Sequence, residues 1–488
     1  MIFVSVLRAL TPWRLSGATD VRNIRTIAGL PVRAALIHLL LFAAAFCFYS
    51  ALWSKAPVTQ PDSGSYLRAA RNLSDFQIDL AQERTPGYPI LLLLTGSSES
   101  PNRALFYVSL LLHFASIWLL SSVLCRAGLS GMKVTCFSLI LLLPPFVEPA
   151  AYVLTETLAE AMLVTAFVSL VSWHLNKRPI WIVISAATIG YAALTRPTYQ
   201  VLALAVATWL VTAYFLRPRT PNSWRNVVKG SLIVISGSIL IVGGYAYFNY
   251  RHFGYFGITY KLGISLTQKT VHVIERLPDE DAAIREVLIR GRNSDLLLSR
   301  GTELGYISPI VPELTQLTGF NEPQLSNYLL KLNLLLIREA PLNYLQDVVL
   351  AFGHYGFPTS NELSNFNSRS LQTLWAVMHF FLIGAFALNL ILLLGAAAYL
   401  KMCNLFVEQL DKINIGGTRL IDFQEFAYGL AGTIVVYTAA ISCFIDVGDP
   451  RHRVPTDVII VFMLFLGTHL WSRLVSLSRM VFERAQAA

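Results

Sequence analysis

The stretch "AALIHLLLFAAAFCFYSALW", residues 34–53, decides the fold class of this chain. It contains no Asp, Glu, Lys or Arg, and at about 1.5 Å per residue a helix of this length crosses the hydrocarbon core of a bilayer. The whole composition agrees, because 55% hydrophobic and 14% charged residues over 488 positions give more apolar surface than a water-soluble core can bury. We therefore predict an all-α polytopic membrane protein.

Nine further apolar runs follow the first one. They are continuous rather than alternating, which favours membrane helices over the strands of a β-barrel. We therefore predict a bundle of about ten transmembrane helices. The predicted spans lie near 34–53, 104–124, 133–147, 153–173, 179–194, 198–216, 229–247, 372–399, 427–446 and 456–475.

Positive charges in the short loops predict the orientation. Arginines at positions 8, 14, 22, 25 and 33 precede the first run, against the single acid Asp20. Lys and Arg concentrate on the cytoplasmic side, so we expect both termini in the cytoplasm, in the setting of a bacterial inner membrane. The net charge of +9 is then a signal of topology, and nucleic acid is not expected as a partner.

This orientation places two long segments on the outer, periplasmic face. They are 54–103 and 248–371, and the second is long enough to form a small domain with amphipathic helices. We predict a transmembrane module over 1–247, an outer domain over 248–371 and C-terminal membrane helices over 372–488. Within the outer domain, "NYLLKLNLLLIREAP" predicts a helix ended by Pro341 that lies on the bilayer or packs on the bundle.

The five cysteines lie in or beside predicted spans and form no CxxC pair. Neither a disulfide framework nor a structural zinc site is expected, and no metal ligand is assigned.

Ionisable residues gather at the outer ends of the predicted spans. Such residues are costly at membrane depth and commonly mark a site, so they predict a cleft on the outer face. The residues are Asp62, Arg84, Glu148, Glu156, Arg196, Asp446, Asp449, Arg451, His452 and Arg453.

Several of these residues also have an ordinary structural explanation. Asp62 is placed to cap a short helix, and Glu156 to cap the fourth span. Arg84 can reach toward lipid phosphate, and Arg196 can be a snorkelling anchor between two spans. The loop "DVGDPRHRVP", residues 446–455, is harder to explain in this way, because it carries more charge than a turn requires.

Six short motifs suggest a family. "PDSGSY" (61–66), "ERTPGYPILLLL" (83–94), "TETLAEAML" (155–163), "LTRP" (194–197), "REAPLNYL" (338–345) and "DPRHRVP" (449–455) occur in this order. Together they resemble the GT-C class of integral membrane glycosyltransferases that use polyprenyl-phosphate sugars. The likeness is greatest to the protein mannosyltransferase and aminoarabinose transferase branch.

The resemblance implies a GT-C-like bundle and a catalytic acid in the first outer loop, which is Asp62 here. It also implies that Arg84 and the other outer basic residues face the donor phosphate. Many members carry two adjacent acids in that loop, whereas Ser63 follows Asp62 in this chain. That difference weakens a metal role built on a second carboxylate, so dependence on a divalent metal is left open.

The chemistry of such a transfer fits these residue types independently of the family. A base must accept the proton of the acceptor hydroxyl, and cations must stabilise the departing phosphate. Asp62 can supply the base. The candidates for phosphate binding are Arg84, Arg196, Arg451 and Arg453, and those for substrate contact or support are Tyr66, Tyr88, Glu156 and His452.

The resulting hypothesis is an inverting transfer of a sugar from a polyprenyl-phosphate donor, within the lipid bilayer, to a glycan, lipid or protein acceptor. The alternative is a transporter or flippase of lipid-linked sugars, which predicts ionisable groups near the bilayer midplane. Glu160 is the nearest candidate for such a group. A non-enzymatic assembly subunit would leave the outer acid and arginines without a task.

Overall fold

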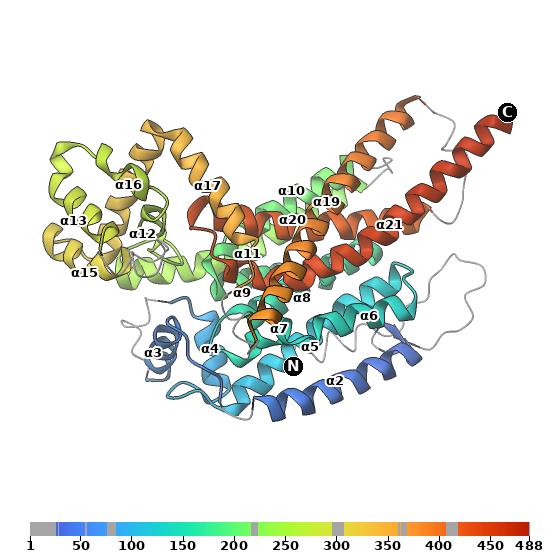
Figure 1. Cartoon of the computed structure of the whole chain (residues 1–488), viewed down its shortest axis with the longest axis horizontal. Coiled ribbons are helices and arrows are strands. Elements are labelled where there is room, and N and C mark those ends of the chain that lie inside the picture. The colour runs from blue at the N-terminus through green and yellow to red at the C-terminus, as the bar shows by residue number, and fades with distance from the viewer. Residues whose placement is uncertain are drawn as a thin grey trace.

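The computed structural model describes residues 26–27, 29–53, 56–75, 84–215, 223–294, 307–359, 362, 368–406 and 418–487. Long helices run side by side through most of the molecule, and shorter helices gather at one end (Figure 1). The strands in the described ranges are a two-residue hairpin, β1 (Thr26–Ile27) with β2 (Leu30–Pro31). The prediction of an all-α fold is confirmed.

In chain order the helices are α2 (Val32–Leu52), α3 (Ser63–Ser74), α4 (Gly87–Leu94), α5 (Arg103–Arg126), α6 (Gly131–Leu141), α7 (Pro144–Val147), η2 (Glu148–Ala151), α8 (Glu156–Asn176), α9 (Pro179–Thr195), η3 (Pro197–Tyr199), α10 (Leu202–Phe215), α11 (Ser223–Phe253), α12 (Leu262–Thr267), η4 (Val271–Arg276), η5 (Asp279–Asp281), α13 (Ala282–Arg292), α15 (Ile307–Thr318), α16 (Glu322–Glu339), α17 (Pro341–Tyr355), α19 (Arg369–Phe406), α20 (Thr418–Ile445), η7 (Pro450–His452) and α21 (Val454–Ala487).

Nine of the ten predicted spans coincide with one helix each, and the third coincides with a bent pair of helices. Within the described ranges, eight helices are long and apolar enough to cross a membrane. The third predicted span is broken, because Gly131–Leu141 and Pro144–Ala151 meet at 67°. The fifth is α9, whose 17 residues are at the short end of the range for a membrane helix.

Several apolar helices have little protein around them. Of the 18 consecutive residues of α19 that are most apolar, 11% are buried inside the protein, whereas the share in the corresponding stretch of α8 is 78%. Water would penalise so much exposed hydrocarbon, whereas lipid tails solvate it without cost. The chain is therefore an integral membrane protein, with α8 near the centre of its bundle and α19 at the edge.

The core of the bundle is one continuous apolar cluster. It joins side chains of α5, α6, α8, α9, α10, α11, α20 and α21. Phe167 of α8 and Phe462 of α21, for example, pack edge to face with ring centroids 5.2 Å apart. This core fixes the ends of the helices that carry the outer polar residues.

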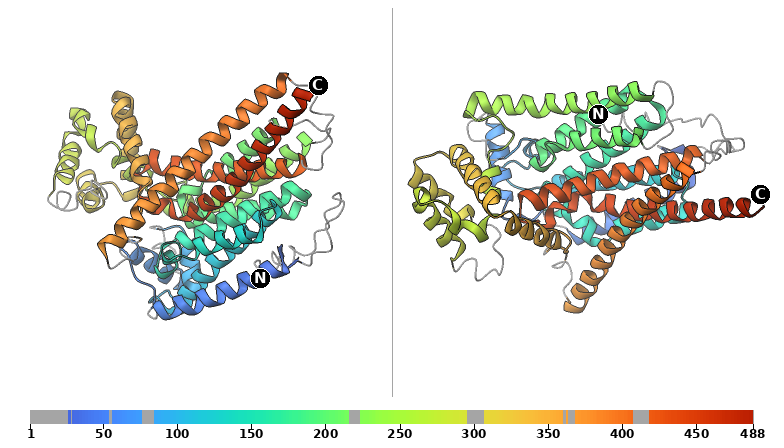
Figure 2. Two further views of the ribbon diagram at one scale, coloured as in Figure 1. Left: turned by 45° about the vertical axis from the view of Figure 1, so that its right-hand side comes forward. Right: turned by 90° about the horizontal axis from the view of Figure 1, so that it is seen from above.

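A small helical unit lies beside one end of the bundle. It consists of α12, η4, η5, α13, α15 and α16, and it has an apolar core of its own that includes Ile274, Leu314 and Leu329. Figure 2 shows the unit beyond the ends of the long helices, joined to them through α17. The domain boundaries at 247/248 and 371/372 stay a prediction.

Helix α16 confirms one part of a prediction and corrects another. It ends at Glu339, just before Pro341, as expected. Its apolar residues Leu325, Leu329 and Leu336 are buried in the core of the small helical unit, however, and not on the bilayer or the bundle. Packing against α12, which the sequence pattern did not indicate, accounts for the difference.

The orientation of the bundle stays a prediction. It rests partly on the arginines at positions 8, 14, 22 and 25, which lie outside the described residues.

Candidate active site

Asp62 precedes the first turn of α3, but its carboxylate does not cap that helix. Its Oδ1 accepts a hydrogen bond from Arg84 Nη2 at 2.8 Å, and its Oδ2 accepts one from Arg451 Nη1 at 3.3 Å. Ser63 ties down the turn instead, because its hydroxyl accepts from the Gln60 amide and donates to the Val153 carbonyl. The capping explanation therefore does not account for Asp62.

Arg84 is held between α3 and α4. Its Nε donates to Ser65 Oγ at 2.7 Å, and its guanidinium lies 4.5 Å from the centre of the Tyr66 ring. Helix α4 passes very close to the end of α9 at Gly87, where a Cβ atom would lie 2.6 Å from the Leu194 carbonyl oxygen. The glycine permits this approach and so places Arg84 beside Asp62.

Tyr88 packs against Tyr66, the ring that contacts Arg84. Its ring is 1% exposed and packs edge to face on Tyr66, with centroids 5.3 Å apart. Both rings belong to one small apolar cluster that also contains Val153 and Leu158. Tyr88 is therefore a packing residue beneath Arg84 and Asp62.

Arg451 bridges two acids that are distant in sequence. It lies in η7, where its Nε and Nη2 both donate to Glu156 Oε1 at 3.3 Å while Nη1 reaches Asp62. Glu156 is the first residue of α8, and the preceding Thr155 makes no side-chain cap. The bridge therefore joins the loop that carries Asp62 and the start of α8 to the short loop that contains η7.

Arg196 approaches Glu156 from the other side. Pro197 disfavours helical backbone at the preceding residue, so Arg196 is extended with φ −139° and ψ 117°. Its Nη1 lies 3.3 Å from Glu156 Oε1, and the residue is 8% exposed. This burial against a carboxylate does not fit a snorkelling anchor, which would reach the interface.

We call Asp62, Arg84, Glu156, Arg196 and Arg451 the Asp62 cluster. It contains three guanidinium groups and two carboxylates, so its formal charge is one positive unit. Glu156 Oε2 and Arg196 Nη1 have no hydrogen-bond partner among the described residues. The surplus positive charge and the unpartnered donor on Arg196 equip the cluster to receive an anionic group.

Shifted pKa values set the charge of Asp62 and of the neighbouring His452 at neutral pH. Burial by itself would raise the pKa of Asp62, but the positive charges of Arg84 and Arg451 outweigh it and leave the pKa below its usual value. Burial, helped by the charge of Arg196, lowers the pKa of His452 to about 4. Asp62 is therefore an anion and His452 is neutral.

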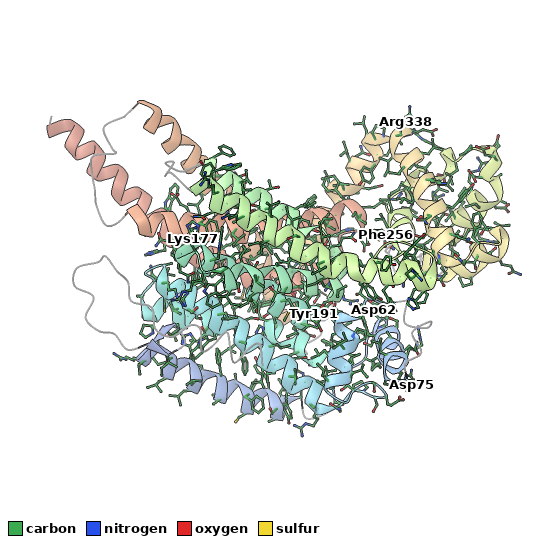
Figure 3. The ribbon with its side chains drawn as sticks, turned by 180° about the vertical axis from the view of Figure 1, so that it is seen from behind. Asp62, Asp75, Lys177, Tyr191, Phe256 and Arg338 are labelled. Carbon is green, nitrogen blue, oxygen red and sulfur yellow. The ribbon has the colours of Figure 1, made fainter. Side chains whose placement is uncertain are left out.

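A cavity of about 770 Å³ opens beside Asp62. Asp62, Ser65 and Arg84 form part of one wall, and Tyr260, Lys261 and Glu322 form part of the facing wall. Figure 3 places Asp62 where the bundle meets the small helical unit, with Asp75 at the other end of α3. The volume is within the range of pockets that bind small organic ligands.

Arg453 does not join the Asp62 cluster. It is 1% exposed and turns toward Asp457 and Glu362, at 2.8 and 3.5 Å. Its Nη1 also donates to the carbonyl oxygens of Tyr355 and Phe357. His452 Nε2 faces Asp446, at 4.0 Å. Of the four predicted phosphate-binding arginines, the structure brings together Arg84, Arg196 and Arg451.

Sequence reasoning missed the facing wall of the cavity. Tyr260 donates a hydrogen bond to Glu322 at 2.5 Å, and both residues line the cavity with Lys261. These residues belong to no recognisable motif, and tertiary packing alone brings them opposite Asp62. In the described ranges, no group of three or more His, Cys, Asp or Glu side chains is arranged to hold a metal ion.

No known family profile matches this chain, and no curated protein sequence matches it. Among solved structures, the apo crystal structure of ArnT from Cupriavidus metallidurans aligns with 90% of this chain and 78% of its own length. The identity is 14% and the TM-score is 0.35. This likeness is too low to assign a fold family or an activity.

Proposed function

We propose that this protein is a membrane glycosyltransferase of the GT-C type that moves a sugar from a polyprenyl-phosphate donor to an acceptor hydroxyl on the periplasmic face of a bacterial inner membrane. One observation carries the proposal. An ionised carboxylate, Asp62, lies between two arginines at the wall of a large cavity, beside a cluster with surplus positive charge. The motif resemblance described above supports the same reaction.

In the proposed reaction Asp62 takes the proton of the acceptor hydroxyl. The hydroxyl oxygen then bonds to the anomeric carbon from the side opposite the phosphate, so the configuration inverts. The bond from that carbon to the phosphate oxygen breaks, and its electron pair stays on the phosphate. Because the leaving group is already stable, the hydroxyl loses its proton late, and a carboxylate of low pKa is sufficient as the base.

The arginines stabilise the charge on the departing phosphate. Arg196 is the strongest candidate, because its buried Nη1 has spare donor capacity. Arg451 can exchange one of its carboxylate contacts for a phosphate oxygen, since its bonds to Glu156 and Asp62 are long, at 3.3 Å. Guanidinium groups stay charged and bind phosphate oxygens in pairs. Glu156 holds both arginines in place.

The acceptor would enter the cavity between α3 and the small helical unit. Its walls combine apolar contacts such as Ile264 and Val311 with polar groups such as Asn321 and Lys261. This mixture suits a hydroxyl-bearing molecule but does not select among glycan, lipid and protein. Arg453 has no part in binding in this proposal, because its donors are used inside the protein.

The test is a transfer assay on purified protein in nanodiscs, with a panel of radiolabelled polyprenyl-phosphate sugars and a mixture of envelope glycans, lipids and peptides as acceptors. The proposal predicts that one donor is consumed and that its sugar appears on an acceptor. The flippase alternative predicts movement of the lipid-linked sugar across the bilayer without any acceptor, and that result would contradict the proposal.

Glu160 bears on the flippase alternative. It is 3% exposed, and its carboxylate pairs with His113 of α5 at 2.9 Å. A transport pathway calls for ionisable groups that line an aqueous path. Glu160 is enclosed among packed helices, and this favours the enzyme.

A further inference from the structure

The break in the third span removes the usual helical donors of several backbone carbonyls. Pro144 and Pro145 have no amide hydrogen, so the carbonyls of Ile140 and Leu141 lose their i+4 donors. The Leu143 amide bonds to Ile140, and the Phe146 amide turns to Leu143, which also leaves Leu142 without its usual donor. Two adjacent carbonyls, Leu141 and Leu142, therefore need donors from elsewhere, since an unpaired carbonyl is costly inside a membrane.

Two neighbouring helices supply those donors. His113 of α5 places Nε2 3.0 Å from the Leu141 oxygen, and Tyr49 of α2 donates its hydroxyl to the Leu142 oxygen at 2.6 Å. Each side chain is buried, at 1% and 2% exposed. The bend between α6 and α7 is thus held by two specific bonds from other spans.

A third helix holds His113 in turn. Its Nδ1 lies 2.9 and 3.2 Å from the two carboxylate oxygens of Glu160 in α8. Nε2 faces a carbonyl and must carry a proton, and one proton lies between Nδ1 and the carboxylate. The ring is therefore fixed at both ends, and rotating it would break bonds on both sides.

The segment that follows the bend reaches the Asp62 cluster. Ala151 accepts a hydrogen bond from the Val58 amide at 2.8 Å, and the Val153 amide donates to Val58 at 3.1 Å. The Ser63 hydroxyl then donates to the Val153 carbonyl at 2.8 Å. Residues 144–153, which we call the strap, thus hold the turn that presents Asp62.

We propose that His113, held by Glu160, is a positioning residue that fixes the strap and through it the place of Asp62. Its consequence for catalysis rests on the glycosyltransferase function proposed above, whereas its consequence for the strap does not. Within the described residues His113 bonds to Glu160 and to the Leu141 carbonyl and to no residue of the Asp62 cluster, so it acts through the backbone at Leu141.

The test compares matched variants by hydrogen exchange of peptides covering 56–66, with peptides from α16 as an internal reference. His113→Leu removes the donor to Leu141, whereas His113→Gln can keep it. His38→Leu is the control, because His38 bonds Ser138 of α6 before the bend. We expect His113→Leu to raise exchange at 56–66 on the order of tenfold and His113→Gln and His38→Leu to stay near wild type.

Transfer kinetics provide the second readout. His113→Leu should lower kcat by about tenfold or more with little change in KM, and His113→Gln should restore kcat. Tyr49→Phe tests the adjacent carbonyl by removing a single oxygen, and it covers the case in which His113→Leu does not fold.

Unchanged exchange at 56–66 in both His113→Leu and Tyr49→Phe would overturn the proposal, as would an equal rise in His38→Leu. If the wild type transfers no sugar, the proposed function fails, yet the exchange measurement still decides whether His113 holds the strap.

Discussion

Arg451 and Arg453 are two residues apart and lie in two different charged clusters. Arg451 joins the Asp62 cluster, whose members Asp62 and Arg84 line the 770 Å³ cavity, and its side chain is 28% exposed. Arg453 joins Asp457 and Glu362 in what we call the Arg453 cluster, with its side chain 1% exposed. Arg451 lies in η7 and Arg453 directly follows it, and their guanidinium groups pair with different acids.

The difference between the clusters separates a site from a structural element. The Asp62 cluster has surplus positive charge and a spare donor on Arg196, and Asp62 and Arg84 line a cavity with room for a ligand. In the Arg453 cluster two acids share one arginine, whose Nη1 donates to two backbone carbonyls. The cavity beside Glu362 and Asp457 holds about 10 Å³, room for at most one water molecule. A cavity of about 20 Å³ lies between the two clusters and is lined by Glu362, Glu156 and Arg451. Charge alone therefore does not mark a binding site in this protein.

The largest expected effect is the loss of Arg453. Arg453→Met leaves Asp457 and Glu362 buried without their cation, which should cost about 3–5 kcal/mol in the free energy of unfolding. Thermal unfolding in detergent measures this. The matched change Arg451→Met should cost about 1 kcal/mol or less, because Glu156 keeps Arg196. Equal destabilisation by both changes would contradict the distinction between the clusters.

In a transfer assay, the activity should depend more on Arg451 than on Arg453, the reverse of their order in stability. Arg451→Lys keeps a positive charge but loses the two-pronged contact with Glu156, so transfer should fall by about 10²-fold while the melting temperature stays unchanged. Arg71→Lys is a suitable control, because Arg71 lies on α3 away from the cluster. Full transfer by Arg451→Lys would remove this arginine from the phosphate site.

The two clusters should also differ in their response to pH. Burial, opposed in part by Arg453, raises the pKa of Glu362 to about 7. A raised pKa stabilises the fold fully at pH values below the pKa of the group in the unfolded chain. This contribution is lost as the pH rises through the pKa of the group in the folded protein. Stability should thus fall as the pH rises from about 4.5, the usual pKa of a glutamate, to about 7, by up to about 1.4 kcal/mol per pH unit, and level off above pH 7.

The pKa of Asp62 is lowered in the folded protein. Its contribution to the stability of the fold is therefore present at pH values above its pKa in the unfolded chain, and it is lost only in acid. Its contribution should therefore stay constant between about pH 5 and pH 7. Melting temperatures of Glu362→Gln should lose the dependence on pH over this range, and those of Asp62→Asn should keep it. The opposite pattern would reverse the assignment.

The smallest expected effect concerns the support of Arg84. Tyr66→Phe removes a hydroxyl that accepts a long bond of 3.4 Å from Arg84 but keeps the ring beneath the guanidinium. Transfer should change less than about fivefold. Tyr66→Leu also removes the ring and should cost more, up to about 30-fold. Equal losses in the two variants would mean that the hydroxyl, not the ring, holds Arg84.

The sequence was sufficient to predict the membrane helices and most of the acid and arginine set. Apolar runs as long as 34–53 have one stable solution in a bilayer, and the charges at the ends of such helices must lie near one another. The break at Pro144 and Pro145 was missed, because the hydropathy of 133–147 is continuous across it.

The sequence could not predict which acids Arg453 pairs with. In "DPRHRVP" the residues 451 and 453 have equal charge and similar neighbours, and their partners Glu156 and Glu362 come from distant elements. The cavity wall at Tyr260 and Glu322 was hidden for the same reason, since it depends on how the small helical unit packs against the bundle.

The central claim is that Asp62 performs chemistry, and single-turnover transfer by Asp62→Asn tests it most directly. Asp75→Asn is the matched control, because Asp75 is exposed at the other end of the same helix. The account predicts that Asp62→Asn binds the polyprenyl-phosphate donor but transfers its sugar about 10²- to 10⁴-fold more slowly, while Asp75→Asn equals wild type. Transfer at the wild-type rate by Asp62→Asn would contradict it.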